Sequence, residues 1–84
     1  MYTFIVNPHA RSGLGQKVWD DLEVILRRQG ISYEVYYTKY QKHATAITAQ
    51  ITSDGYEHTI VALGGDGTVN EVVNGIQDFS KTIF

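Results

Sequence analysis

The sequence predicts an α/β fold of three layers, in which a parallel sheet lies between helices and the elements follow the order βαβαβα. Three short β-forming runs, at 2–6, 32–37 and 59–63, alternate with longer segments in which apolar residues have helical spacing. The third run is entirely apolar at 60–63, as expected of a parallel strand covered on both faces. Right-handed crossovers between the strands then place helices on both faces of the sheet.

The first strand is expected at Tyr2–Val6, because Pro8 cannot donate to a ladder and ends it. A helix is expected from Lys17 to Gln29, since acidic residues come early in it and arginines late, which suits the helix dipole. Gly30 supplies the C-terminal stop. The residues predicted for the buried stripe are Val18, Leu22, Ile25 and Leu26, with Trp19 packing beside them.

Apolar and polar residues alternate through 31–38, which predicts a second strand at Ser32–Tyr37 with one face less buried, as near a sheet edge. A second helix is expected to begin at His43 and to end at Ser53–Gly55. The tyrosines around this strand, at 33, 36, 37 and 40, are interpreted as sheet packing and not as a base-stacking surface. The scattered histidines, at 9, 43 and 58, are interpreted as surface or capping residues.

The third strand, expected at Thr59–Leu63, breaks into glycines and continues as a helix with a predicted buried stripe. The stripe residues are Val69, Val72, Val73 and Ile76, at helical spacing. Residues 80–84 are predicted to be the first residues of a fourth strand.

The glycines after the third strand predict a phosphate-binding loop. Gly64, Gly65 and Gly67 have no Cβ, so their backbone can take φ > 0 and approach a bulky anion with its N–H groups. The positive end of the following helix dipole faces the same place. A turn without a ligand is the less favoured alternative. Asp66 would compete with an anion, so its presence is best explained by a Mg²⁺ ion or a substrate hydroxyl bound there.

Three other predictions keep a structural alternative beside the functional one. Thr68 and Glu71 have the T-x-x-E spacing of a capping box, which alone would explain both. The loop 9–15, with Ser12 and Gly13, follows a strand end, where ligands of open α/β sheets bind, but it is equally well a flexible connection. Thr38 ends the second strand on the same rim and either contacts a ligand or caps a turn.

Composition limits the other classes of function. With 84 residues, 43% hydrophobic and 19% charged, the chain is expected to form one small globular domain. A net charge of −2 gives no basic footprint for nucleic acid. The absence of cysteine excludes disulfides and thiolate metal sites. No apolar run approaches the length of a transmembrane span and no signal peptide is apparent, so the cytoplasm is the expected location.

The motif G-G-D-G-T-V-N-E-V-V-N-G, preceded by N-P-H-A-R-S-G-L-G-Q-K, resembles the catalytic domain of the diacylglycerol kinase family, which includes sphingosine and ceramide kinases. The resemblance implies a lipid kinase that transfers the γ-phosphoryl group of ATP, with Mg²⁺, to a diacylglycerol-like hydroxyl. Residues 1–84 would be the N-terminal part of its ATP-binding domain. The second, β-rich domain, with the lipid pocket and the general base, has no counterpart here, so no catalytic base is assigned.

The same resemblance implies which residues hold the nucleotide, with Asp66 also the candidate contact for Mg²⁺. These residues are Asn7, Pro8, Ser12, Gly13, Thr38, Gly64, Gly65, Asp66, Gly67, Thr68, Asn70 and Glu71.

Two alternatives remain open at this point: a nucleotide-binding or oligomerising module without chemistry, and an NAD kinase, whose family shares the G-G-D-G-T loop. The continuation T-V-N-E-V-V-N-G favours the lipid kinases. The chain alone is expected to lack kinase activity, and the longer enzyme could lie at the membrane surface. A homo-oligomer is expected, because open sheet edges recruit strands and the segment 80–84 could be exchanged between copies.

Overall fold

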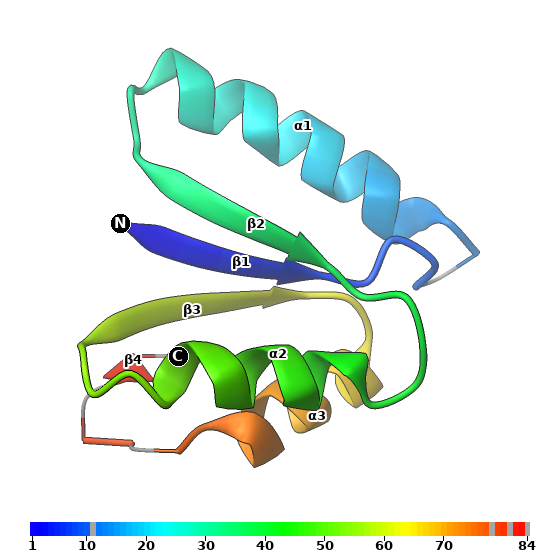
Figure 1. Ribbon diagram of the computed structural model, residues 1–84. Helices are drawn as coiled ribbons and strands as arrows, with labels where there is room; N and C mark the ends of the chain where they lie inside the picture. The colour runs from blue at the N-terminus through cyan, green and yellow to red at the C-terminus, as the bar shows by residue number, and fades with distance from the viewer. Residues whose placement is uncertain (11, 78, 81, 84) are drawn as a thin grey trace.

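The computed structural model describes residues 1–10, 12–77, 79–80 and 82–83. They form a four-stranded parallel sheet in the order β2-β1-β3-β4. Figure 1 shows α1 on one face of this sheet and α2 and α3 on the other, which confirms the predicted three-layer α/β fold. The strands are β1 (Tyr2–Val6), β2 (Tyr33–Tyr37), β3 (His58–Leu63) and β4 (Thr82–Ile83). The helices are α1 (Leu14–Arg28), α2 (His43–Thr52) and α3 (Asp66–Gly75).

The central strand β1 divides the core into two clusters. Phe4 and Val6 face α1, while Ile5 faces α2 and α3. On the α1 side, the ring of Phe4 lies 5.1 Å from that of Trp19. All three strand residues are almost completely buried, with exposed fractions of 4% or less. The strand is therefore covered on both faces, as parallel sheets require.

Helix α1 begins at Leu14, earlier than predicted, and its buried face differs from the predicted stripe. Trp19 is fully buried, whereas Val18 and Ile25 are 43% and 54% exposed. The assignment of Val18 and Ile25 to the core was therefore wrong. The helix is rotated so that its largest side chain lies on the sheet, because an indole buries more apolar surface than valine or isoleucine.

Helix α3 shows the same kind of rotation. Val69 is 39% exposed, so its predicted place in the core was wrong, while Val72 and Ile76 are buried as predicted. Thr68 and Gly75 complete the buried side. A Cβ at position 75 would lie 2.5 Å from the Thr45 carbonyl oxygen. Gly75 therefore permits the close approach of α3 to α2.

The short strand β4 pairs in parallel with β3, His58 with Thr82 and Thr59 with Ile83, so the predicted start of a fourth strand is confirmed at these residues. Lys81 and Phe84 lie outside the described residues. The exchange of this segment between copies stays a prediction. Among the residues that the structure describes, no helix is both long and apolar enough to cross a bilayer.

We predict that Gly75→Ala lowers the free energy of unfolding by about 1–3 kcal/mol, because the added methyl group forces α2 and α3 apart. The matched control is Asn74→Ala on the exposed side of the same helix, which should change stability by less than about 0.5 kcal/mol. Urea unfolding followed by circular dichroism measures both. Equal stabilities for the two variants would contradict the close helix contact.

Candidate functional site

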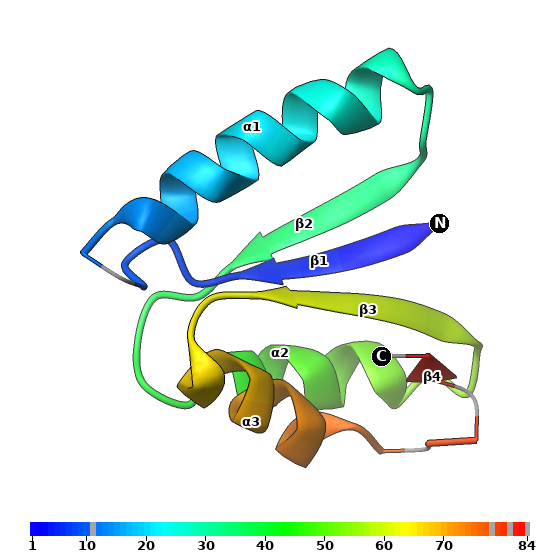
Figure 2. The same ribbon diagram turned by 180° about the vertical axis from the view of Figure 1, so that it is seen from behind.

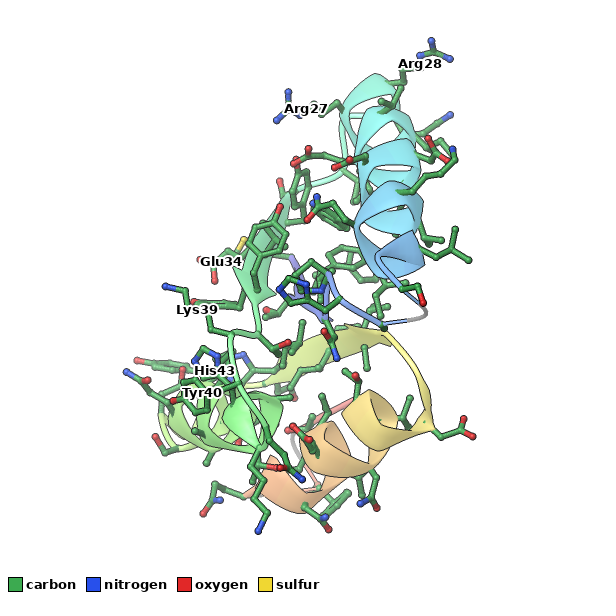
Figure 3. The ribbon with its side chains drawn as sticks, turned by 90° about the vertical axis from the view of Figure 1, so that its right-hand side faces the viewer. Arg27, Arg28, Glu34, Lys39, Tyr40 and His43 are labelled. Atoms are coloured by element: carbon green, nitrogen blue, oxygen red, sulfur yellow. The ribbon has the colours of Figure 1, made fainter. Side chains whose placement is uncertain are left out.

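The carboxyl ends of β1, β2 and β3 meet on one rim of the sheet, which faces the viewer in Figure 3. Val6 pairs with Tyr37 on one side and with Leu63 on the other. Beyond these pairs, the Asn7 N–H donates to the Leu63 carbonyl (2.8 Å) and the Thr38 N–H donates to the Val6 carbonyl (2.9 Å). The loops that follow the three strands therefore start at the same level.

Asn7 connects two of these loops through its side chain. Its Oδ1 accepts a hydrogen bond from the His9 N–H (3.1 Å), which shapes the turn after β1. Its Nδ2 donates to the Thr68 Oγ1 at 3.5 Å, the upper limit for such a bond. Thr68 is buried in the first turn of α3. One amide thus links the loop after β1 to the helix that follows the glycines.

The glycines after β3 do not take the left-handed backbone conformation expected of them. Positive φ angles occur at other glycines, and Gly65 has φ −86° and ψ −174°, so the argument from left-handed backbone was wrong for this loop. Gly64 instead provides close packing: a Cβ there would collide with the Thr68 side chain and lie 3.2 Å from the Asn7 Cβ. The positions of Gly65 and Gly67 have open space around them.

The start of α3 also excludes the capping-box alternative. The helix begins at Asp66, its N-cap is Gly65, and no side chain caps it. Thr68 is therefore already inside the first turn, and its N–H donates to the Gly65 carbonyl (3.0 Å). The uncapped N-terminus of α3 carries the positive end of the helix dipole, which suits an anion.

A cavity of about 340 Å³ opens between the loops. It contains four of the predicted residues: Asn7, Thr38, Thr68 and Glu71. Four residues that the sequence analysis did not assign to the site also line it: His9, Lys39, Tyr40 and Gln41. Each of these four lies within three positions of Asn7 or Thr38, the first residues after β1 and β2. Their place close behind the strand ends was the signal that could have found them.

The loop after β2 is held in shape by local contacts. The Lys39 N–H donates to His43 Nδ1 (2.9 Å), and the rings of Tyr40 and His43 are stacked with centroids 4.2 Å apart (Figure 3). Lys42 takes a left-handed conformation with φ 67°. Helix α2 has Lys42 as its N-cap and no side-chain cap, so His43 holds the loop and does not cap the helix. The wall of the cavity formed by this loop is therefore ordered without a ligand.

A second hollow, of about 390 Å³, adjoins the first along α2 and α3, and Gln41 and Glu71 line both. It contains the predicted residues Gly67 and Asn70. Lys42 lines this hollow and Lys39 lines the first, so a cation is available to each. These two polar hollows together form the candidate site.

The remaining predicted residues lie around the site without lining either hollow. Ser12 and Gly13 are exposed in the turn before α1 and have left-handed φ angles of 57° and 93°. Pro8 lies in the turn after β1, and Gly65 in the turn after β3. Gly64 lines a separate, more apolar hollow of about 170 Å³ on the α1 side. Arg11, the cationic residue of the loop 9–15, lies outside the described residues.

Asp66 is exposed at the first position of α3. Within the part of the chain that the structure describes, no group of three or more histidine, aspartate or glutamate side chains could hold a metal ion. A metal held here would therefore need most of its ligands from a bound molecule and from water. Mg²⁺ is commonly bound in that way, by one or two carboxylates with phosphate oxygens.

A family model described as the diacylglycerol kinase catalytic domain matches residues 1–83. The chain is 36% identical to the diacylglycerol kinase of Staphylococcus carnosus, over 92% of this chain and 25% of that protein. It is 37% identical to the ceramide kinase of Arabidopsis thaliana, over 83% of this chain and 12% of that protein. A solved structure described as "a putative diacylglycerol kinase from Bacillus anthracis str. Sterne" matches with a TM-score of 0.70 and 31% identity, over 88% of this chain and 26% of that chain. The chain thus spans about a quarter of the length of these bacterial relatives.

We predict that Gly64→Ala lowers the free energy of unfolding by about 1–3 kcal/mol, because its methyl group displaces Thr68 and the Asn7 loop. Gly67→Ala is the matched control: its methyl group meets open space inside a helix, so stability should stay the same or rise by up to about 1 kcal/mol. Urea unfolding measures both. A Gly67→Ala variant that loses as much stability as Gly64→Ala would contradict the assigned packing role of Gly64.

Proposed function

The chain belongs to the diacylglycerol kinase catalytic-domain family, and from this premise we propose that residues 1–84 are the N-terminal part of the ATP-binding domain of a lipid kinase. The proposed reaction transfers the γ-phosphoryl group of ATP to the hydroxyl of a diacylglycerol-like lipid. The observation that carries the proposal is one polar cavity, lined by the residues after β1 and β2 and by the first turns of α3, beside the uncapped N-terminus of that helix. Phosphoryl transfer depends mainly on such positioning and on charge neutralisation.

In this proposal the phosphates of ATP lie at the start of α3. The backbone N–H groups of Gly65, Asp66 and Gly67 are the donors for phosphate oxygens, because a helix N-terminus leaves its first N–H groups without intrahelical partners. Ser12 and Gly13, with the Asn7–Pro8 turn, approach the phosphates from the side of β1. Open space around Gly65 and Gly67 leaves room for a bulky anion.

The nucleoside part of ATP is assigned to the two polar hollows. Thr38, Thr68 and Asn70 offer neutral polar groups there. These groups can form hydrogen bonds to the ribose or the base without burying a charge. Glu71 lines both hollows, and its carboxylate would repel a phosphate. We therefore assign Glu71 to a hydroxyl donor such as those of the ribose.

Asp66 is the proposed contact for Mg²⁺, either directly or through water. When bound, Mg²⁺ neutralises charge on the phosphates during transfer. The exposed carboxylate at the start of α3 fits this role, because it lies beside the N–H groups assigned to the phosphates. We assign no general base to the described residues. We further propose a cytoplasmic enzyme that meets its lipid acceptor at a membrane surface.

We predict that ATP with Mg²⁺ shifts the amide resonances of the chain at one rim of the sheet only. The affected signals should include those of Gly64, Gly65 and Gly67. The internal controls are Gly30 and Gly55, which precede β2 and β3 and so lie at the opposite rim. The measurement is a ¹⁵N-labelled titration to about 10 mM nucleotide, beyond a Kd on the order of 1 mM. Shifts confined to the Gly30 and Gly55 rim, or none at all, would refute the proposed site.

We predict that Asp66→Asn weakens the binding of ATP in the presence of Mg²⁺ and leaves its binding in EDTA almost unchanged. The variant removes a charge that would bind the metal and keeps the shape of the side chain. Its melting temperature should fall only slightly, since Asp66 is exposed and the variant loses only a favourable charge at the helix N-terminus. Asp21→Asn, at an exposed position of α1, is the matched control and should bind ATP as the parent chain does. An equal loss of ATP affinity with and without Mg²⁺ would show that Asp66 does not act through the metal.

A further inference from the structure

Among the described residues, no strand pairs with the outer edge of β2. β2 stands at one end of the sheet order and is paired there with β1. Its five residues, Y-E-V-Y-Y, are mostly β-forming; Glu34 is their one charge, and neither proline nor lysine interrupts them. Natural edge strands usually carry such interruptions, because an open edge recruits other strands. This edge therefore has the composition of a strand that pairs.

Two hydrogen bonds at the ends of the β1–β2 ladder show which residues of β2 face β1. The Tyr2 N–H donates to the Ser32 carbonyl (3.2 Å), and the Thr38 N–H donates to the Val6 carbonyl (2.9 Å). Along a strand, the backbone groups of successive residues turn alternately to its two edges. The even-numbered residues of β2 thus bond to β1. The residues with outward N–H and C=O groups are Tyr33, Val35 and Tyr37.

We propose that two copies of this chain pair through β2, antiparallel and about a two-fold axis at Val35, to form one continuous sheet. In this register Val35 faces the partner's Val35, and Tyr33 faces the partner's Tyr37. All outward backbone groups of the strand then donate to or accept from the other copy. A two-fold pair of this kind is closed, so it does not grow further through the same edge.

Charge and strand length select this register over its neighbours. If the two-fold axis moves one residue toward the start of the strand, Glu34 lies opposite the partner's Glu34. Like charges directly opposite each other are destabilising. If the axis moves one residue toward the end of the strand, Tyr33 and Glu34 have no partner residue in the other strand. Only the register centred on Val35 pairs the whole strand and keeps the carboxylates apart.

The side chains on the α2 face of β2 are complementary in this register. Glu34 lies opposite the partner's Tyr36, in a pair of the closer type, with Cα atoms about 4.5 Å apart. Within one chain the Tyr36 hydroxyl already donates to Glu34 (3.3 Å). Burial raises the pKa of the Tyr36 phenol, and the charge of Glu34 adds to this, so the phenol stays a donor. Because a phenol has one O–H, each Tyr36 can exchange this bond for one to the partner's Glu34, so every carboxylate keeps a phenol donor in the pair.

A hollow beside Glu34 gives the partner's ring a place to lie. It has a volume of about 290 Å³, and Ile47 and Ile51 of α2 form part of its lining. Figure 3 shows Glu34 on the outer side of β2, away from α1. Because the partner's Tyr36 faces Glu34, its ring lies next to this hollow. Apolar surface on Ile47 and Ile51 would then be buried by the second copy.

Pairing leaves the candidate nucleotide site open. The strands run in opposite directions, so the rim with Thr38 in one copy lies at the far end of the joined edge from that rim in the other. Figure 2, the view from behind, shows β2 along the edge of the sheet with its carboxyl end at the rim of the site. The proposal needs no bound nucleotide and stands apart from the proposed function.

Sedimentation equilibrium of the 84-residue chain and its charge variants tests the proposal. The parent chain should be a dimer at about 100 μM. Tyr36→Glu places a glutamate opposite the partner's Glu34 and should raise the dimer Kd at least about tenfold, whereas Tyr36→Lys should leave it equal or lower. Adding Glu34→Lys to Tyr36→Glu restores opposite charges and should restore the dimer. Circular dichroism checks that each variant is folded.

A backbone variant separates strand pairing from side-chain effects. Tyr37→Pro removes an outward N–H and no bond to β1, so the monomer should keep its circular dichroism spectrum and the dimer should weaken at least about tenfold. A monomeric parent chain at about 100 μM would overturn the proposal. So would a dimer that tolerates both Tyr37→Pro and Tyr36→Glu, because that dimer must use another surface.

Discussion

The in-register pairing of β1 with both of its neighbours is the constraint on which the rest of the structure depends. Val6 lies between Tyr37 and Leu63, and the chain leaves all three strands at that level. The loops after β1, β2 and β3 are far apart in the sequence, and they are neighbours only because the ladder ends are level. A slip of one residue in either pairing would turn side chains to the opposite face and separate the walls of the cavity.

Close packing at Gly64 then joins the aligned loops after β1 and β3 at the candidate site. Because position 64 has no Cβ, the Thr68 side chain can lie against the backbone and within reach of Asn7. Gly64 therefore acts through the protein's own atoms, while the positions of Gly65 and Gly67 have open space around them. Glycines of one motif thus differ physically: one is required for packing, and the other two are not.

The order of strands and helices along the chain and the strand ends could be predicted from the sequence, because each depends on local signals. Apolar runs, a proline after β1 and glycines after β3 fix where strands stop, and the crossover rule fixes their direction. The buried faces of α1 and α3 could not be predicted fully, because apolar residues cover more of each helix than the sheet can cover. Exposed Val18 and Val69 are as apolar as residues that are buried. The packing of Trp19 decides the rotation of α1, and the packing of Gly75 decides that of α3.

The candidate site, like the fold, could be predicted from the sequence in part. Asn7, Thr38 and Thr68 carry signals in the sequence, since each lies at a strand end or in the glycine motif. Lys39 and Tyr40 carry a weaker signal, their place after a strand end, because their positions in the cavity also depend on a left-handed residue at 42 and on a hydrogen bond to His43. Neither of these local interactions has a pattern that composition or periodicity could reveal.

The walls of the cavity are not equally supported. Asn7 follows a strand that is bonded on both sides, whereas Thr38 follows β2, which is bonded on one side only. Edge strands open more readily than central ones, since fewer hydrogen bonds must break. The bond from Lys39 to His43 and the stacked Tyr40 ring compensate at this wall, because they tie the loop after β2 to the start of α2. The order of the Thr38 side of the cavity therefore depends on His43 as much as on the sheet.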